Sequence, residues 1–261
     1  MRNIWTIAKR EYDHYFISPI AYVVAFMLLL TTGVLFVVNL YNYIQYAFQS
    51  FNAAPDLSPI FGSFGLLLVL TIPALTMRLI ADEARLGTLE LMLTAPVRDF
   101  ELVAGKWLGG LLFILSIIAV TLIYPIILNG IVIGSVTILP PLVSPSLDRG
   151  LMLSGYLGVT LIAAAFLALG VGISAIFTNQ IAAFFVTLIT FMVLWWLIGF
   201  PAAILQPGTA QQLFQFLDMK THFYAGFAAG NIAVADLLYF FSLIAFGLFL
   251  GTTAVEVRRW R

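Results

Sequence analysis

The chain alternates between long apolar runs and short polar segments. Six of the runs are long enough to cross the roughly 30 Å hydrocarbon core of a bilayer as helices. They cover residues 20–40, 60–80, 107–133, 151–177, 181–200 and 236–255. The middle of each run holds no aspartate, glutamate, lysine, arginine or histidine. The pattern predicts an all-α, polytopic membrane protein with six transmembrane helices, forming a single transmembrane domain over residues 1–261.

The composition supports a lipid environment. Only 9% of the residues are charged and 62% are hydrophobic, whereas a soluble domain carries about 25% charged residues. The formal net charge is zero and no basic run occurs, which makes membrane lipid, and not nucleic acid, the expected partner. The absence of cysteine excludes disulfides, thiol catalysis and thiolate metal sites.

The first sixteen residues have helical amphipathic spacing. One side carries the apolar or aromatic residues Ile4, Trp5, Ala8, Tyr12, Tyr15 and Phe16, and the other carries Arg2, Thr6, Lys9, Arg10 and Asp13. Basic residues opposite an aromatic stripe are typical of a helix that lies in the headgroup plane. We expect an interfacial helix over residues 1–16; a frayed terminal tail is the other interpretation.

Basic residues are distributed unevenly between the predicted loops. If the N-terminus is cytoplasmic, ten of the twelve lie on the cytoplasmic side, and only Arg149 and Lys220 lie outside. The ten are Arg2, Lys9, Arg10, Arg78, Arg85, Arg98, Lys106, Arg258, Arg259 and Arg261. The positive-inside rule therefore predicts a multi-pass protein of the inner (plasma) membrane with both termini in the cytoplasm.

The predicted spans lack the groups that power transport or catalysis. Ion-driven transporters use ionisable residues or broken helices near the midplane, and the sequence predicts no intramembrane acid–base pair, metal cluster or nucleophile–base set. No Walker loop is present, because Gly105-Lys106 is followed by Trp107 and Phe100 stands where a glycine is needed. We expect no enzyme activity in this chain, so any energy for transport comes from another subunit.

A charged elbow over residues 82–106 separates the second and third spans. Residues 82–94 are predicted to form a short helix that Pro96 ends, and Asp99 to cap a second helix that continues through Lys106. The apolar stripe of the first helix, residues 82–94, consists of Leu86, Leu89, Met92 and Leu93. The charged residues of the same helix, Glu83, Arg85 and Glu90, are expected to face polar surroundings. Such a stripe needs cover from a protein groove, or from lipid if the helix is merely interfacial.

These residues resemble a known family. Residues 81–97 read ADEARLGTLELMLTAPV, residues 10–22 read REYDHYFISPIAY, residues 72–78 read IPALTMR and residues 178–184 read TNQIAAF. Together they resemble ABC type-2 permeases, the membrane subunits of ATP-binding-cassette exporters, and most of all the gliding-motility-associated branch. The resemblance covers nearly the whole chain.

The resemblance implies a role for each part. The N-terminal helix would be a connecting helix, and the elbow a coupling helix that docks in a cleft of an ABC ATPase. The coupling residues would be Glu83, Arg85, Leu86, Gly87, Thr88, Leu89, Glu90, Met92, Leu93 and Pro96. Asp82 replaces a common glutamate, and Ala84 stands where a basic residue is frequent, which removes one ion pair with the ATPase. ATP and Mg would be bound by that partner, leaving no cofactor in this chain.

Two further segments concern packing and gating. Ala164, Ala168 and Gly172 are spaced four apart in the fourth span, a pattern that lets helices approach closely, either within the chain or at a dimer contact. Residues 201–235 hold two apolar pieces too short to span. The resemblance implies short outer-leaflet helices here, forming an extracytoplasmic re-entrant gate; a surface amphipathic loop is the alternative.

The predicted function is that of an exporter permease. It would form the translocation pathway as a dimer with a second permease subunit, identical or not, driven by a separate ATPase. The alternative is a non-conducting scaffold or mechanotransmission subunit that anchors an ATPase and contacts an accessory envelope protein. A polytopic membrane enzyme is disfavoured because the predicted spans do not place a set of polar catalytic residues at a common depth in the membrane.

Overall fold

The computed structural model describes residues 2–47, 57–88, 97–132 and 148–259, and every regular element in these ranges is helical. Six helical stretches are long and apolar enough to cross a membrane. They are Pro19–Gln45, Ser58–Leu86, Asp99–Leu128, Arg149–Ile176, Gln180–Ile204 and Val234–Arg259. The predicted all-α fold with six transmembrane helices is thereby confirmed.

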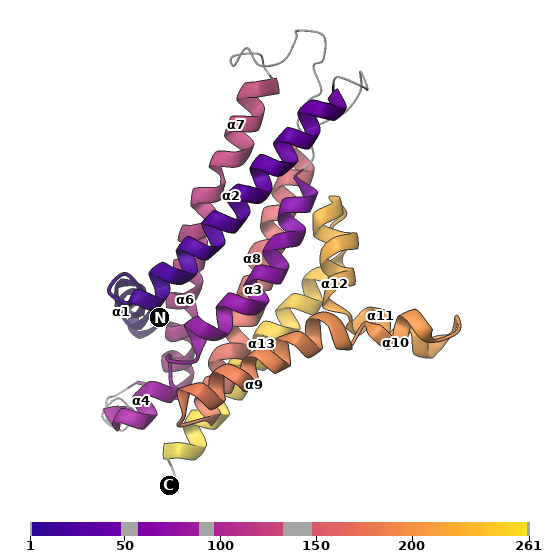
Figure 1. The fold of residues 1–261 in the computed structure, drawn as a ribbon. Helices are drawn as coiled ribbons and strands as arrows, with labels where there is room; N and C mark the ends of the chain where they lie inside the picture. The colour runs from indigo at the N-terminus through magenta and orange to yellow at the C-terminus, as the bar shows by residue number, and fades with distance from the viewer. Residues whose placement is uncertain (1, 48–56, 89–96, 133–147, 260–261) are drawn as a thin grey trace.

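The long helices lie side by side and form one bundle (Figure 1). In chain order the elements are α1 (Arg2–Tyr15), α2 (Pro19–Ala47), α3 (Ser58–Thr76), α4 (Ala81–Leu86), α6 (Asp99–Thr121), α7 (Ile123–Val132), α8 (Arg149–Ile176), α9 (Gln180–Met192), the π-helical η1 (Val193–Leu197), α10 (Phe200–Ile204), α11 (Thr209–Leu217), α12 (Met219–Thr221), the π-helical η2 (His222–Gly226), the 3₁₀-helical η3 (Phe227–Ala229) and α13 (Val234–Arg259). Helix α8 is buried along most of its length, whereas α2, α9 and α13 expose wide apolar faces. Those faces suit contact with lipid.

Helices α8 and α13 approach backbone to backbone. A Cβ atom on Gly247 would lie 2.5 Å from the carbonyl carbon of Ala168, and one on Gly172 would lie 2.6 Å from the carbonyl oxygen of Gly247. Only small residues allow such an approach. Ala164 lies one turn earlier, where its carbonyl accepts a hydrogen bond from Trp107 Nε1 at 2.9 Å. The small-residue stripe of the fourth span therefore lies inside this chain's own bundle.

The segment between the fifth and sixth spans has two differently placed parts. Residues 219–229 fold back into the bundle, where Tyr224 donates to the carbonyl of Gly62 at 2.9 Å and Ser154 donates to the carbonyl of Phe227 at 2.8 Å. Backbone at membrane depth requires this protein cover. Helix α11 instead projects from the bundle (Figure 1), contains no buried residue, and leaves Leu213 and Phe216 more than half exposed.

Helix α1 crosses the long helices and packs against the first half of α6 (Figure 1). The glycines of α6 create the room: a Cβ on Gly105 would lie 2.7 Å from Ile7 Cβ, and one on Gly109 would lie 2.7 Å from Glu11 Cβ. Ala8 is fully buried at this contact, while Trp5 remains 58% exposed. The amphipathic helix thus has one face on protein and keeps aromatic surface outside.

Candidate functional site

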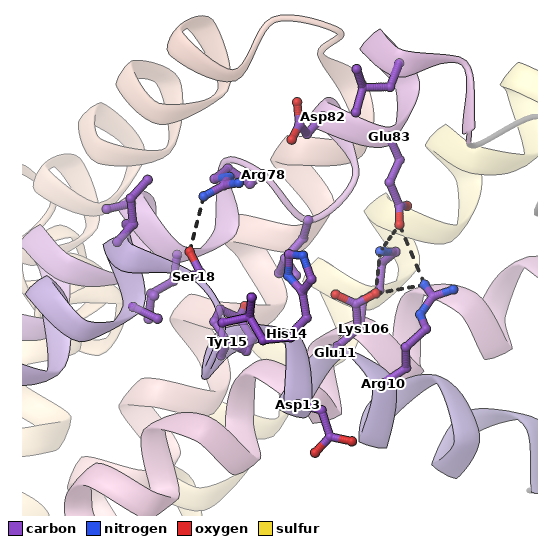
Figure 2. Close-up of a pocket in the computed structure, with 17 residues that line it drawn as sticks. Arg10, Glu11, Asp13, His14, Tyr15, Ser18, Arg78, Asp82, Glu83 and Lys106 are labelled. Atoms are coloured by element: carbon purple, nitrogen blue, oxygen red, sulfur yellow. Dashed lines mark hydrogen bonds and ion pairs between the residues drawn. The ribbon is translucent and has the colours of Figure 1, made fainter.

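A buried lysine joins three helices at the end of the bundle that carries α1 and α4. Lys106 lies on α6 and is 1% exposed. Its Nζ lies 2.9 Å from Oε1 of Glu11 on α1 and 2.7 Å from Oε1 of Glu83 on α4 (Figure 2). A buried ammonium requires partners of this kind, because desolvation without them is very costly. The contacts tie α1, α4 and α6 together.

Arg10 completes a group of four charges, which we call the Lys106 cluster (Arg10, Glu11, Glu83 and Lys106). Its Nη2 lies 2.9 Å from Glu11 Oε1 and 3.7 Å from Glu83 Oε1. Burial alone would raise the pKa of the Glu11 carboxyl, but Lys106 and Arg10 outweigh this effect and hold that pKa below its ordinary value. Two cations face two carboxylates, so the cluster is neutral when all four groups are ionised.

The orientation of Glu83 differs from the sequence prediction. Periodicity placed Glu83 with Arg85, facing polar surroundings, but its carboxylate turns inward to Lys106. Arg85 does remain exposed and pairs along the helix with Asp82 at 3.0 Å. Asp82 also accepts a hydrogen bond from Gln180 at the start of α9. The prediction for Glu83 was wrong because its partner is 23 residues further along the chain.

Helix α4 is also anchored to α8 at its start, and it ends at a glycine. The amides of Ile80 and Ala81 donate to Ser174 Oγ on α8 at 3.3 and 3.1 Å, which satisfies donors that a helix start leaves free. The helix stops at Gly87, whose φ of +70° lies in the left-handed region that glycine tolerates best. Leu86 points outward and is 64% exposed. A short, firmly held helix therefore presents an apolar side chain to its surroundings.

The predicted coupling residues are only partly described. Glu83, Arg85, Leu86, Gly87 and Thr88 lie together on α4 and directly after it, with Thr88 Oγ1 donating to the carbonyl of Glu83 at 3.3 Å. Leu89, Glu90, Met92, Leu93 and Pro96 lie outside the described residues. Two predictions for the elbow were wrong. The helix predicted over residues 82–94 is interrupted at Gly87, because its left-handed backbone ends α4, and Arg98 is the N-cap of α6, so Asp99 is the first helical residue and not the cap.

A pocket of about 470 Å³ adjoins the Lys106 cluster. It lies between α1, the start of α2, the end of α3 and α4, and the cluster forms one side of it (Figure 2). On the other side, Arg78 Nη1 donates to Ser18 Oγ at 3.2 Å. The pocket therefore combines charged groups with the ends of two apolar spans.

A second buried pair holds the re-entrant part. His222 Nδ1 lies 2.6 Å from Asp236 Oδ1, and its Nε2 lies 2.7 Å from the carbonyl oxygen of Phe216. His222 therefore connects Asp236 on α13 with the end of α11. No group of three potential metal ligands occurs in the part of the chain that the structure describes.

These two clusters lie near the ends of spans, which the expectation of uncharged span middles did not cover. Lys106 and Asp236 belong to helices that qualify as spans, each within two turns of a helix end. Sequence reasoning missed them because their partners, Glu11 and His222, come from other segments. One signal was present: Gly105 and Gly109 are spaced four apart, a pattern typical of close helix contact, and they flank Lys106.

Comparison with protein families identifies the family of the chain. A protein-family model described as "ABC-2 family transporter protein" matches residues 5–255. The matched range includes all residues of the Lys106 cluster, the pocket and the His222–Asp236 pair. No curated protein matches the chain.

Proposed function

The chain belongs to the ABC-2 transporter family, and we propose that it is the permease subunit of an exporter driven by a separate ABC ATPase. Family membership and six apolar helices make it a multi-pass membrane protein and a transport subunit. In the proposed assembly, two permease subunits enclose the pathway and two ATPase subunits bind at one end. ATP and Mg are held by those ATPases.

The observation that carries the proposal is the attachment of α4. This helix exposes Leu86 at the end of the bundle, and Glu83, one turn earlier in the same helix, reaches the buried Lys106. A partner that pushes α4 therefore displaces α6 through Lys106 and α1 through Glu11. The Ser174 contact extends the same linkage to α8. Packed helices transmit such shifts because their interfaces do not deform continuously.

The orientation follows from the charge distribution. The positive-inside rule places α1, α4 and the end of α13 on the cytoplasmic side of the inner (plasma) membrane, where an ATPase would meet them. Residues 201–235 then lie on the opposite side, and the buried part at residues 219–229 is positioned as an extracytoplasmic gate. The gliding-motility-associated branch remains the subgroup that the motifs in residues 10–22 and 81–97 resemble.

A second candidate function is mechanotransmission without a conduit. The observation that favours it is α11, which projects from the bundle with Leu213 and Phe216 exposed (Figure 1). An accessory envelope protein would find an apolar surface there. The Lys106 cluster would serve both functions equally, since each requires force to pass from an ATPase to the spans.

Reconstitution with an ABC ATPase from the same organism, chosen as the proposed partner, tests the proposal. We expect the two proteins to co-purify, and the Glu83→Ala/Glu90→Ala double variant to keep its spans folded while losing the link between ATP hydrolysis and transport in liposomes. Glu256→Ala, which removes an exposed acid near the C-terminus, is the matched control. Unchanged transport and substrate-stimulated hydrolysis in the double variant would contradict the proposal. Hydrolysis and partner movement without transport in the wild type would favour mechanotransmission.

A further inference from the structure

The α1–α4 pocket has charged and apolar walls at the level where two spans end. Its apolar lining includes Ile17 in the turn before α2, Ile20 at the start of α2, Leu75 near the end of α3 and Leu79 in the turn that follows α3. Ile17 is 78% exposed, so this wall continues onto the outer surface of the spans. A ligand with alkyl chains can therefore enter the pocket with its polar end while its chains stay in lipid.

One cation of the pocket is not neutralised by a carboxylate. Within the described ranges, Arg78 makes a single side-chain hydrogen bond, to the neutral hydroxyl of Ser18 at 3.2 Å, and no ion pair. The other basic residues of the lining, Arg10 and Lys106, are both engaged with Glu11 and Glu83. A guanidinium with open donor positions is the group best suited to bind a phosphate.

One carboxylate oxygen of the pocket lacks a donor. Oε1 of Glu83 receives Lys106, but Oε2 is buried and has no hydrogen-bond partner among the described residues. Tyr15, another lining residue, is 7% exposed and its hydroxyl likewise has no partner in the described part of the chain. Buried polar atoms without partners are costly. Because Oε2 of Glu83 is fully buried, a ligand that supplies N–H groups satisfies it once the carboxyl group turns toward the pocket.

The charges of the lining select between lipid classes. Three cations and four carboxylates line the pocket. Asp82 is engaged by Arg85 and Gln180, and Asp13 points away from the Lys106 cluster (Figure 2). A headgroup with only negative charge would meet more carboxylates than cations. A headgroup that carries one phosphate and one ammonium matches both Arg78 and Glu83.

We propose that the α1–α4 pocket binds the phosphoethanolamine headgroup of a membrane phospholipid, with the phosphate on Arg78 and the ammonium on Oε2 of Glu83. The lipid belongs to the leaflet in which α1 lies, and it links the α1–α2 turn to α3 and α4. The proposal does not depend on the transport role, because the site is built from this chain's own residues. The bound lipid is distinct from any transported substrate.

Lipid binding to the purified full-length chain tests the proposal. The delipidated protein in detergent is titrated with phosphatidylethanolamine, phosphatidylcholine or phosphatidylglycerol, and bound lipid is counted by native mass spectrometry. We expect phosphatidylethanolamine to bind about tenfold more tightly than the other two, because a charge-assisted hydrogen bond contributes enough for roughly that ratio. Water-soluble glycerophosphoethanolamine serves as the competitor without alkyl chains and should displace the lipid poorly.

Three variants locate the site. Arg78→Gln should lower phosphatidylethanolamine binding about tenfold. Lys9→Gln, which removes an exposed charge of α1 outside the pocket, should leave it unchanged. Ala74→Phe fills the pocket without altering its charge, and it should abolish binding even if Arg78→Gln does not fold.

Several results would overturn the proposal. Equal or tighter binding of phosphatidylglycerol would show that the site prefers net negative charge, and equal binding of phosphatidylcholine would remove the role of the ammonium donors. Full displacement by glycerophosphoethanolamine would identify a site for a soluble ligand. Binding that survives both Arg78→Gln and Ala74→Phe would place the lipid elsewhere.

Discussion

The Nζ atom of Lys106 lies 2.7 Å from Oε1 of Glu83, which joins the second turn of α6 to the short helix that follows the second span. The same nitrogen reaches Glu11 on α1. Arg10 is the second cation near Glu11 and Glu83, but it is shared between the two carboxylates and lies 3.7 Å from Glu83 Oε1. The stability of this junction therefore depends on Lys106 more than on any other residue of the cluster.

Replacing Lys106 with methionine should destabilise the protein by about 3–5 kcal/mol, because the change leaves two buried carboxylates without their shared partner. Unfolding in a mixed detergent titration measures the loss. Lys9→Met is the matched control, and as an exposed substitution it should stay within about 0.5 kcal/mol of the wild type. Similar midpoints for both variants would show that the buried contacts contribute little.

The Glu11 carboxylate should make stability depend on acid pH. Its folded-state pKa lies below the ordinary value of 4.5, so its contribution is fully present above about pH 4.5 and is lost as the pH falls through the folded-state pKa. Thermal unfolding of wild type and Glu11→Gln between neutral and acidic pH measures this. The variant should be less stable at pH 7 and should show a flatter profile below pH 4.5; parallel profiles would exclude Glu11 as the cause.

A methyl group at Gly247 should disrupt the contact between α8 and α13. The new Cβ would lie 2.5–2.7 Å from backbone atoms of Ala168 and Leu169, and overpacking of this kind costs about 1–3 kcal/mol. Gly208→Ala is the control, since Gly208 has extended φ and a methyl carbon there would lie 3.8 Å from its nearest neighbour. Gly247→Ala should lower the unfolding temperature and Gly208→Ala should not. Equal unfolding temperatures for the two variants would show that the contact between α8 and α13 accommodates the added methyl group without loss of stability.

The His222–Asp236 pair should show strong coupling in a double-mutant cycle. Each single alanine variant leaves a buried partner unpaired, whereas the double variant removes both. We expect a coupling energy of about 1–3 kcal/mol from unfolding measurements. A cycle of Asp236 with the exposed His14 should give less than about 0.5 kcal/mol. A value that small for His222 as well would show that the two groups act independently.

The sequence predicts those structural features that are determined by residues close together in the chain. Span length is a local property, and each of the six apolar runs corresponds to a helix that qualifies as a span. Helix ends were predicted less well: the helix expected over residues 82–94 is interrupted at Gly87, and Arg98, not Asp99, precedes α6 as its N-cap.

Contacts between distant segments could not be predicted in this way. Glu11 and Lys106 are 95 residues apart, and nothing near either residue indicates the other. The amphipathic pattern of residues 1–16 showed which side of α1 is polar, but not that Glu11 lies at the border with α6. The inward turn of Glu83 has the same origin, since periodicity alone treats every polar side chain as solvent-facing.

The position of Lys106 in the chain bears on how the protein is made. Lys106 lies within two turns of the start of its helix, where a charge opposes insertion by less than the roughly 2.5–3.5 kcal/mol that it costs at the helix centre. Both of its carboxylate partners precede it, at positions 11 and 83, and synthesis proceeds from the N-terminus. When the third span leaves the ribosome, the groups that neutralise its ammonium already exist. Moving the segments that carry Glu11 and Glu83 to the end of the gene would reverse that order, and Lys106 would then remain unpaired at the end of the third span until they are made.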